Sequence, residues 1–215
     1  MRAELDSLTD AITKRLPGLV VSHTSLSNRL EFLFRAELEV AHARAMTPLR
    51  LAQFAAGRHC ARDAIAELGA EISPVLAGPE GEPLWPAGLV GSISHKGETA
   101  LAAIAQAELY RSVGIDLELD EISDDGWLTE VMAPGDRFMT PVRSLATALL
   151  SAKESYYKAQ FPVTRESPYW PDVCVQSAQD GTFRGIGPCG VVANGVQLAT
   201  GPWIVSVCIV RHAHV

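Results

Sequence analysis

The order of its apolar patterns is the feature that most constrains how this chain folds. Each half of the 215-residue sequence carries helix patterns first and strand patterns afterwards, with a boundary near 111–113. No Pro-, Gly- or Ser-rich linker separates the halves at that point, so we expect them to pack tightly against each other. Hydrophobic residues make up 47% of the chain, which is typical of a globular protein. The pattern predicts an α+β protein with two related halves.

Two segments carry the strongest helix patterns. One runs from Pro48, a residue suited to a first helical turn, to about Leu68, and Gly69 suits the position after it. The other covers Leu145–Phe161, and a further helix or helix pair is expected over Glu31–Arg44. Residues 1–30 are weakly patterned, so loose packing is expected there. Strands are predicted, in chain order, at Leu89–Ser94, Ala100–Ala105, Ser112–Glu118, Asp172–Ser177, Thr182–Ile186, Gly190–Ala199 and Trp203–Val210, the last four forming an antiparallel meander.

Charge and targeting signals narrow the classes of function. The net charge of −7 argues against a nucleic acid as partner. The N-terminal sequence MRAELDSLTD lacks the apolar core of a signal peptide, and no run of about 18 apolar residues predicts a membrane span. The four cysteines have no metal-binding spacing. We therefore expect a cytoplasmic protein that binds neither nucleic acid nor membrane.

Arginines interrupt the apolar stripe of the first strong helix. Arg58 lies four residues after Phe54 on that stripe, Arg62 follows one turn later, and Arg50 precedes it by two turns. Three arginines along one helix edge suit a polyanion such as a phosphate. A structural ion pair with an acid such as Glu67 is the alternative, because a charge on an inward face needs a partner.

Two carboxylates share one face of a predicted strand. Asp116 and Glu118 are two positions apart, so both side chains point to the same side. Their repulsion is relieved when a cation lies between them, and Mg²⁺ is often bound by carboxylates together with substrate phosphates. The alternative is an ordinary solvated strand. Eight acids and no Lys or Arg lie within Asp116–Asp136.

The second strong helix also carries charge within an apolar pattern. Lys153 lies among leucines and tyrosines, which leaves its charge unexplained. Beside it, Glu154 and Lys158 have the i,i+4 spacing of an ion pair, and a plain surface pair is the alternative reading. Ser94 and His95 end a predicted strand before a glycine turn, where they suit phosphate contacts; a structural histidine is the alternative.

Five motifs together resemble the 4′-phosphopantetheinyl transferases of the two-lobed type that activates surfactin and enterobactin synthetases. The resemblance covers about half of the chain, from Arg50 to Thr164. Its motifs, in order, are R-x-x-x-F-x-x-G-R-x-x-A-R (Arg50–Arg62), G-E-P-x-W-P (Gly81–Pro86), G-S-I-S-H (Gly91–His95), V-G-I-D-x-E (Val113–Glu118) and K-E-S-x-Y-K-A (Lys153–Ala159). One departure is Glu80, which stands where many members of the family have a lysine near the nucleotide.

The resemblance implies two pseudo-duplicated α+β lobes with the active site at their interface. Residues 1–112 would form the lobe that holds the 3′-phosphate and adenine of coenzyme A. Residues 113–215 would supply the metal carboxylates, the catalytic helix and the antiparallel sheet. The implied reaction transfers the 4′-phosphopantetheine arm of coenzyme A to a carrier-protein serine and releases 3′,5′-ADP. A non-catalytic coenzyme A or carrier-binding protein and another Mg²⁺-dependent phosphoryl or nucleotidyl transferase are the rival hypotheses.

The resemblance also implies roles for individual residues. Asp116, Glu118 and Glu154 would bind Mg²⁺, or Mn²⁺ as an alternative. Glu154 and Lys158 would be catalytic, with Glu154 as the base for the serine proton. The residues expected to bind coenzyme A are Arg50, Arg58, Arg62, Ser94, His95, Lys153 and Lys158. The implied partners are acyl or peptidyl carrier proteins, or the carrier domains of polyketide, nonribosomal-peptide or fatty-acid synthases, and a monomer is expected.

Overall fold

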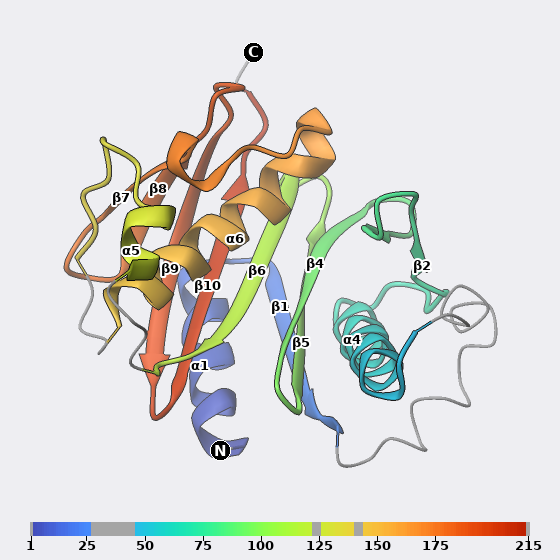
Figure 1. Ribbon diagram of the computed structural model, residues 1–215. Helices are drawn as coiled ribbons and strands as arrows, with labels where there is room; N and C mark the ends of the chain where they lie inside the picture. Colours follow the sequence, from blue (N-terminus) through green and yellow to red (C-terminus); the bar gives the residue numbers. More distant parts are fainter. Residues whose placement is uncertain (1, 27–45, 122–125, 140–143, 214–215) are drawn as a thin grey trace.

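The computed structural model describes residues 2–26, 46–121, 126–139 and 144–213 (Figure 1). The helix predicted over Glu31–Arg44 lies outside these residues. Within them, two larger antiparallel sheets are each covered by one long helix, two short strands form a small third sheet, and the N-terminal helix packs against strands of both larger sheets. The mixed architecture confirms the predicted α+β class.

The smaller sheet has three strands in the order β1-β5-β4, with bounds Leu19–Ser25, Thr99–Gln106 and Leu89–Lys96. Its outer face is covered by α4 (Pro48–Glu67), which follows the predicted helix closely. Thr47 caps the first turn by accepting a hydrogen bond from the backbone of Arg50. Small residues dominate the buried face of α4, so the helix packs closely on β5.

The larger sheet has five strands in the order β6-β10-β9-β8-β7. The strand β6 (Ser112–Leu119) forms one edge, and the other four are the predicted meander: β7 (Cys174–Ser177), β8 (Thr182–Ile186), β9 (Val192–Thr200) and β10 (Trp203–Val210). The helix α6 (Leu145–Thr164) crosses one face of this sheet (Figure 1). Short elements complete the chain: β2 (Leu76–Ala77), β3 (Pro83–Leu84), α5 (Gly126–Val131) and η2 (Trp170–Asp172).

Both halves share one order of elements. In the first, β1 is followed by α4 and then by β4 and β5, and β1 pairs with β5, the last strand. In the second, β6 is followed by α6 and later by β9 and β10, and β6 again pairs with the last strand. All these pairs are antiparallel. The shared order begins with a strand in both halves, and α1 precedes it only at the start of the chain. The expectation of a helix first is therefore wrong for the second half, in which β6 precedes α6.

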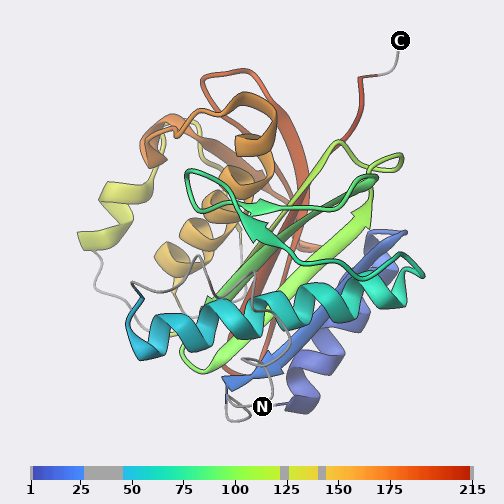
Figure 2. The same ribbon diagram turned by 90° about the vertical axis from the view of Figure 1, so that its right-hand side faces the viewer.

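The N-terminal segment is well packed, so the expectation of loose packing over residues 1–30 is wrong for the part the structure describes. The helix α1 (Arg2–Arg15) buries Leu5, Leu8 and Ile12 and leads into β1. These side chains join one core cluster with β5 of the smaller sheet and with β6, β9 and β10 of the larger one. The stripe was hard to recognise because only four residues of α1 are buried. Figure 2, turned by 90° from Figure 1, shows α4 in front of the sheets.

Two further expectations concern membranes and cysteines. In the parts of the chain that the structure describes, no helix combines the length and apolar character needed to cross a bilayer. All four cysteines are free, and Cys60 and Cys208 are buried as small apolar side chains.

Candidate active site at the junction of the two sheets

The candidate site begins where β4 and β6 lie side by side without belonging to the same sheet. The hydroxyl of Ser94 on β4 donates a hydrogen bond to Oδ1 of Asp116 on β6 at 3.1 Å. It also accepts one from the backbone N–H of Leu117 at 3.2 Å. Ser94 and Asp116 are both buried. Ser94 thus joins the two halves and orients the first of the predicted carboxylates.

The helix α6 adds Lys158 to the same point. Its ammonium donates to Asp116 Oδ1 at 2.7 Å, to the carbonyl of Ile115 at 3.1 Å and to the Ser94 hydroxyl at 3.2 Å. The close approach of α6 depends on Gly114 of β6, because a Cβ there would lie 2.6 Å from the backbone nitrogen of Ala159 and nearer still to the Ser155 carbonyl. The glycine therefore lets the helix place Lys158 directly against the strand.

The three predicted carboxylates influence one another. Partial burial raises the pKa of Glu154 above its usual value, and the charges of Asp116 and Glu118 raise it further, while Lys158 acts in the opposite direction. Glu118 forms an ion pair with Lys96 at the end of β4. These effects indicate that the three acids lie near one another, and their role as metal ligands stays a prediction.

The donor set of this region suits a hard divalent cation. Three carboxylates supply the oxygen ligands that Mg²⁺ prefers. The second oxygen of Asp116, Oδ2, is buried and has no hydrogen-bond partner among the described residues, which is an unusual state for a carboxylate. Two of the acids are neutralised by lysines instead. No group of His, Cys, Asp and Glu within the described ranges is arranged closely enough to hold a metal as it stands.

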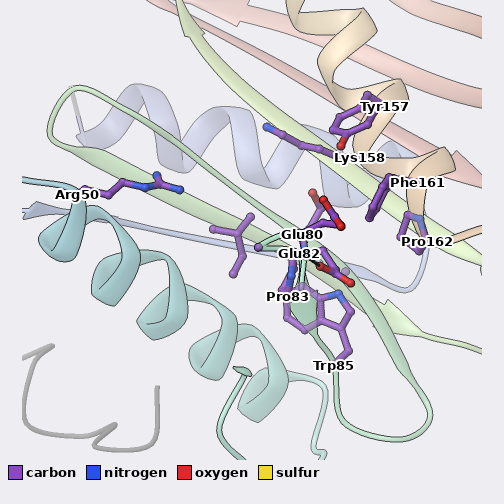
Figure 3. A pocket seen from close by; sticks show the side chains of 13 residues that line it. Arg50, Glu80, Glu82, Pro83, Trp85, Tyr157, Lys158, Phe161 and Pro162 are labelled. Atoms are coloured by element: carbon purple, nitrogen blue, oxygen red, sulfur yellow. Dashed lines mark hydrogen bonds between the residues drawn. The ribbon is translucent and has the colours of Figure 1, made fainter. Parts of the chain in front are cut away.

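A pocket of about 320 Å³ opens beside these charges. The loop that connects β2 and β3 forms one wall with Glu80 and Glu82, next to Trp85, which follows β3, and α6 forms another wall. Figure 3 shows that the charged ends of Arg50 and Lys158 point toward one another across this space. An ion pair of Glu82 with Arg165 ties the loop to the end of α6. The pocket is therefore lined by two cations, by the acids of the loop and by apolar side chains of α6.

Glu80 belongs to this pocket wall. Its side chain is exposed, and its backbone N–H donates to the Glu82 carboxylate at 3.0 Å. The acid that replaces the expected lysine therefore faces the pocket region, although Arg50 and Lys158 still supply positive charge there.

His95 lies next to the pocket cations. Its Nε2 contacts a guanidinium nitrogen of Arg50, an arrangement that requires a neutral ring to accept the hydrogen bond. Burial, followed by the charges of Arg50 and Lys158, lowers the pKa of His95 to about 4. Arg50 and His95, both among the residues predicted to bind phosphate, are thus in contact, and Arg50 carries the charge.

The structure corrects the prediction for Lys153. This side chain is fully buried on the other side of α6, where it pairs with Asp136 at 2.8 Å and donates to the carbonyls of Val131 and Trp170. Positions 153 and 158 are five residues apart and point about 140° away from each other on a helix. Lys153 therefore anchors α6 to the preceding loop and does not reach the pocket.

Arg58 and Arg62 lie deeper in the first half than Arg50. Both are buried, and neither is among the described residues that line the pocket. Arg58 donates through Nε to the Val75 carbonyl at 3.0 Å, and its guanidinium lies 4.1 Å from the centre of the Phe54 ring. These contacts fit the structural alternative, so the predicted phosphate role of Arg58 and Arg62 stays a prediction.

Two features of the site were missed from the sequence. Lys96, which binds Glu118, follows Ser94 by two positions on the same strand, so strand alternation would have placed both on one face. The pocket wall formed by Tyr157, Phe161 and Pro162 lies on the turn of α6 around Lys158. Helical spacing could have placed Tyr157 and Phe161 beside Lys158, but the helix was predicted to end at Phe161, before Pro162.

Comparison with known proteins finds similarity to one family. Residues 38–105 match the family model of the 4′-phosphopantetheinyl transferase N-terminal domain. The chain is 37% identical over 136 residues to the 4′-phosphopantetheinyl transferase PptT of Mycobacterium tuberculosis, covering 60% of each protein. It is 40% identical over 133 residues to the 4′-phosphopantetheinyl transferase Svp of Streptomyces mobaraensis, covering 59% of this chain and 54% of that protein.

A third similar protein is named as a component of enterobactin synthase. Enterobactin synthase component D of Salmonella typhi is 40% identical over 120 residues, covering 51% of this chain and 48% of that protein. The chain thus spans between about half and 60% of the length of these curated relatives. The residues matched by the family model include α4 and β4. Over these matched parts, the chain is similar to the 4′-phosphopantetheinyl transferases.

Proposed function

We propose that this protein transfers the 4′-phosphopantetheine arm of coenzyme A to a serine of an acyl or peptidyl carrier protein, with release of 3′,5′-ADP. The observation that carries the proposal is the convergence of Asp116, Glu154 and Lys158 beside a pocket lined by Arg50. A pyrophosphate needs cations, and its displacement needs a base next to the attacking hydroxyl. The relatives named as 4′-phosphopantetheinyl transferases support the same reaction.

The chemistry consists of one substitution at phosphorus. The serine oxygen forms a bond to the pantetheine-side phosphorus, the bond to the oxygen of the nucleotide breaks, and 3′,5′-ADP leaves with that electron pair. Glu154 accepts the serine proton, and its raised pKa makes it a stronger base than an exposed glutamate. Lys158, held at the Asp116 carboxylate, stabilises the charge that develops on the phosphate oxygens.

Asp116, Glu118 and Glu154 would hold Mg²⁺, with Mn²⁺ as an alternative. When bound, the ion supplies Lewis-acid stabilisation of the phosphate oxygens. Coenzyme A itself would lie in the pocket, with its phosphates toward Arg50, Lys158 and the Ser94–His95 turn. The shared order of elements in the two halves supports a pseudo-duplicated pair of lobes, 1–112 and 113–215, with this site at their junction.

The test is the intact mass of apo carrier proteins after incubation with coenzyme A and Mg²⁺, together with measurement of released 3′,5′-ADP. We expect a panel of fatty-acid, polyketide and nonribosomal-peptide carriers to include at least one that gains the phosphopantetheine arm. Modification of none of them would favour a non-catalytic coenzyme A or carrier-binding protein. Release of a nucleotide product other than 3′,5′-ADP would indicate a different transferase.

Two isosteric variants test the assigned acids. Asp116→Asn and Glu154→Gln should lower the transfer rate about a hundredfold or more, because the first removes a carboxylate that would hold the metal ion and the second removes the base. The control is Glu71→Gln, which changes an exposed acid outside the site by the same chemistry. Transfer at the wild-type rate by either site variant would contradict the assignment.

A further inference from the structure

Two residues of β4 face two residues of β6 in matching positions. Ser94 contacts Asp116, and two positions further along each strand Lys96 contacts Glu118. Side chains two positions apart on a strand share a face. The two strands therefore advance in the same direction and form two successive cross-contacts. The first is a buried hydrogen bond, and the second is a partly exposed ion pair.

The two lysines of the site are held very differently. Lys158 makes three hydrogen bonds, to Asp116, Ser94 and the Ile115 carbonyl, and its side chain is 24% exposed. Lys96 has one ion pair among the described residues, with Glu118, and its side chain is 40% exposed. A long, exposed lysine side chain exchanges such a contact for water at little cost. Lys96 is therefore the displaceable cation of this cluster.

The charge of the cluster explains why a displaceable cation is needed. Three carboxylates lie near one another, and their repulsion is a cost that the chain must offset when no divalent ion is bound. An ammonium neutralises a carboxylate but cannot bridge several of them as a divalent ion does. An ammonium and a divalent ion on the same carboxylate would also repel each other strongly at that distance. A divalent ion on Glu118 would therefore weaken the contact of the exposed Lys96 with that carboxylate.

We propose that Lys96 is an internal competitor for the metal ion: it holds Glu118 in the metal-free protein and leaves it when a divalent cation binds, and so sets the cation affinity of the site. The inference rests on the proposed function, since it takes Asp116, Glu118 and Glu154 as the metal carboxylates. It adds a residue that binds neither metal nor substrate in this scheme and acts through Glu118.

The first test is calorimetric titration of the full chain with Mn²⁺. Lys96→Met removes the charge and keeps most of the side-chain length, so we expect Mn²⁺ to bind about three- to tenfold more tightly. Lys96→Arg keeps the competing charge and should bind Mn²⁺ no more tightly than the wild type. Lys14→Met removes an equal charge from exposed α1 and should change the affinity little. Unchanged or weaker binding by Lys96→Met would overturn the proposal.

The second test needs no variant. Acetylation of lysines by an activated ester, read out by mass spectrometry, reports how free each amine is. Adding Mn²⁺ to the wild-type protein should increase the labelling of Lys96 severalfold relative to Lys14. Labelling of Lys96 that stays constant or falls would show that metal binding does not release it. If neither the wild-type protein nor Lys96→Met binds Mn²⁺, the proposed competition is also refuted.

The test of the competition by Lys96 and the test of the proposed function can give different results. Transfer of phosphopantetheine to a carrier is measured by the mass of the carrier, whereas competition is measured by Mn²⁺ affinity and by labelling. A protein that modifies carriers but shows no effect of Lys96 on Mn²⁺ binding would leave the proposed function intact and refute the competition. A protein with the competition but without transfer would refute only the proposed reaction.

Discussion

At the scale of single residues, two lysines of α6 have different roles, one at the candidate site and one in a buried ion pair. Lys158 faces the carboxylates of β6, whereas Lys153 is enclosed between the helix and the loop before it. Burial lowers the pKa of Lys153, and the carboxylate of Asp136 opposes that shift. Asp136 also accepts hydrogen bonds from the backbone of Ala133 and Val175. The pair therefore joins three segments of the chain beneath the site.

Removal of Lys153 should be costly for stability. Lys153→Met leaves the carboxylate of Asp136 buried without its cation, so we expect the free energy of unfolding to fall by about 3–5 kcal/mol. The double variant Lys153→Met/Asp136→Asn removes both charges and keeps an acceptor for the backbone N–H groups. Its free energy of unfolding should fall clearly less than that of Lys153→Met alone. Urea denaturation measures both, with Lys14→Met as the control. A loss below about 1 kcal/mol for the single variant would contradict the buried pair.

His95 offers a second prediction at this scale. Because its pKa is held at about 4, the folded protein keeps the ring neutral at pH 5–8, while the unfolded chain protonates near pH 6.5. The folded state thus binds fewer protons, and stability declines as the pH falls from about 6.5 toward 4. Arg50→Ala should raise the pKa of His95, although burial still keeps it below 6.5. NMR titration of the ring tests this, and a wild-type value near 6.5 would contradict it.

The residues recognised from the sequence are those whose placement follows local rules. Asp116 and Glu118 share a face by strand alternation, and Glu154 and Lys158 by helical spacing, so their grouping could be predicted. The role of Lys153 could not, because its partner Asp136 is brought close only by the packing of a loop against α6. Its position in an apolar face was noticed, but the same pattern fits a buried ion pair as well as a phosphate ligand.

At the scale of elements, the site depends on how closely α6 lies against β6. Gly114 is the point of closest approach, and the Ser112 hydroxyl also donates to the Ala159 carbonyl. Further along, Gln197 of β9 donates to the Ala148 carbonyl at 2.8 Å and to the Ser206 hydroxyl at 2.8 Å. The helix is thus fixed at several points along its length, and the sheet sets the positions of Glu154 and Lys158.

Gly114→Ala should disturb this contact. The added methyl group would collide with backbone atoms of Ser155 and Ala159, which cannot move aside as a side chain does. We expect a loss of stability of about 1–3 kcal/mol and a larger fractional loss of carrier modification, because α6 carries the base and a phosphate-binding lysine. Gly69→Ala adds the same methyl group in open space at a positive φ, so it loses stability through backbone strain alone and should leave carrier modification unchanged. Wild-type stability and transfer in Gly114→Ala would contradict the close contact.

The elements themselves were largely predictable. The boundaries of α4, β4, β5 and β6 agree with the sequence patterns within a few residues, because capping and turn residues mark them. The pairing of the strands was harder to predict from the sequence. That β1 completes the first sheet, and that β6 pairs with the last strand of the chain, depends on contacts between distant segments. Periodicity within a short window carries no information about such contacts.

At the scale of the whole molecule, the two sheets share one core. The cluster around α1 contains side chains from β5 of the smaller sheet and from β6, β9 and β10 of the larger one. The site lies at the same junction, where Ser94 and Asp116 meet. Any relative shift of the two halves would therefore separate residues of β4 from residues of β6. A shared core is the simplest way to keep such a site assembled.

A cooperative molecule should respond as one unit when this core is weakened. Ile12 is fully buried in α1 within the shared cluster, so Ile12→Ala should lower the free energy of unfolding by about 2–5 kcal/mol. Hydrogen exchange followed by mass spectrometry should show β5 and β10 losing protection by the same amount. Ile72→Ala removes the same atoms from a side chain that is 57% exposed, and it should change stability by less than about 0.5 kcal/mol. Loss of protection in only one of the two strands would show that the halves unfold separately, and that the site is held together by its polar contacts alone.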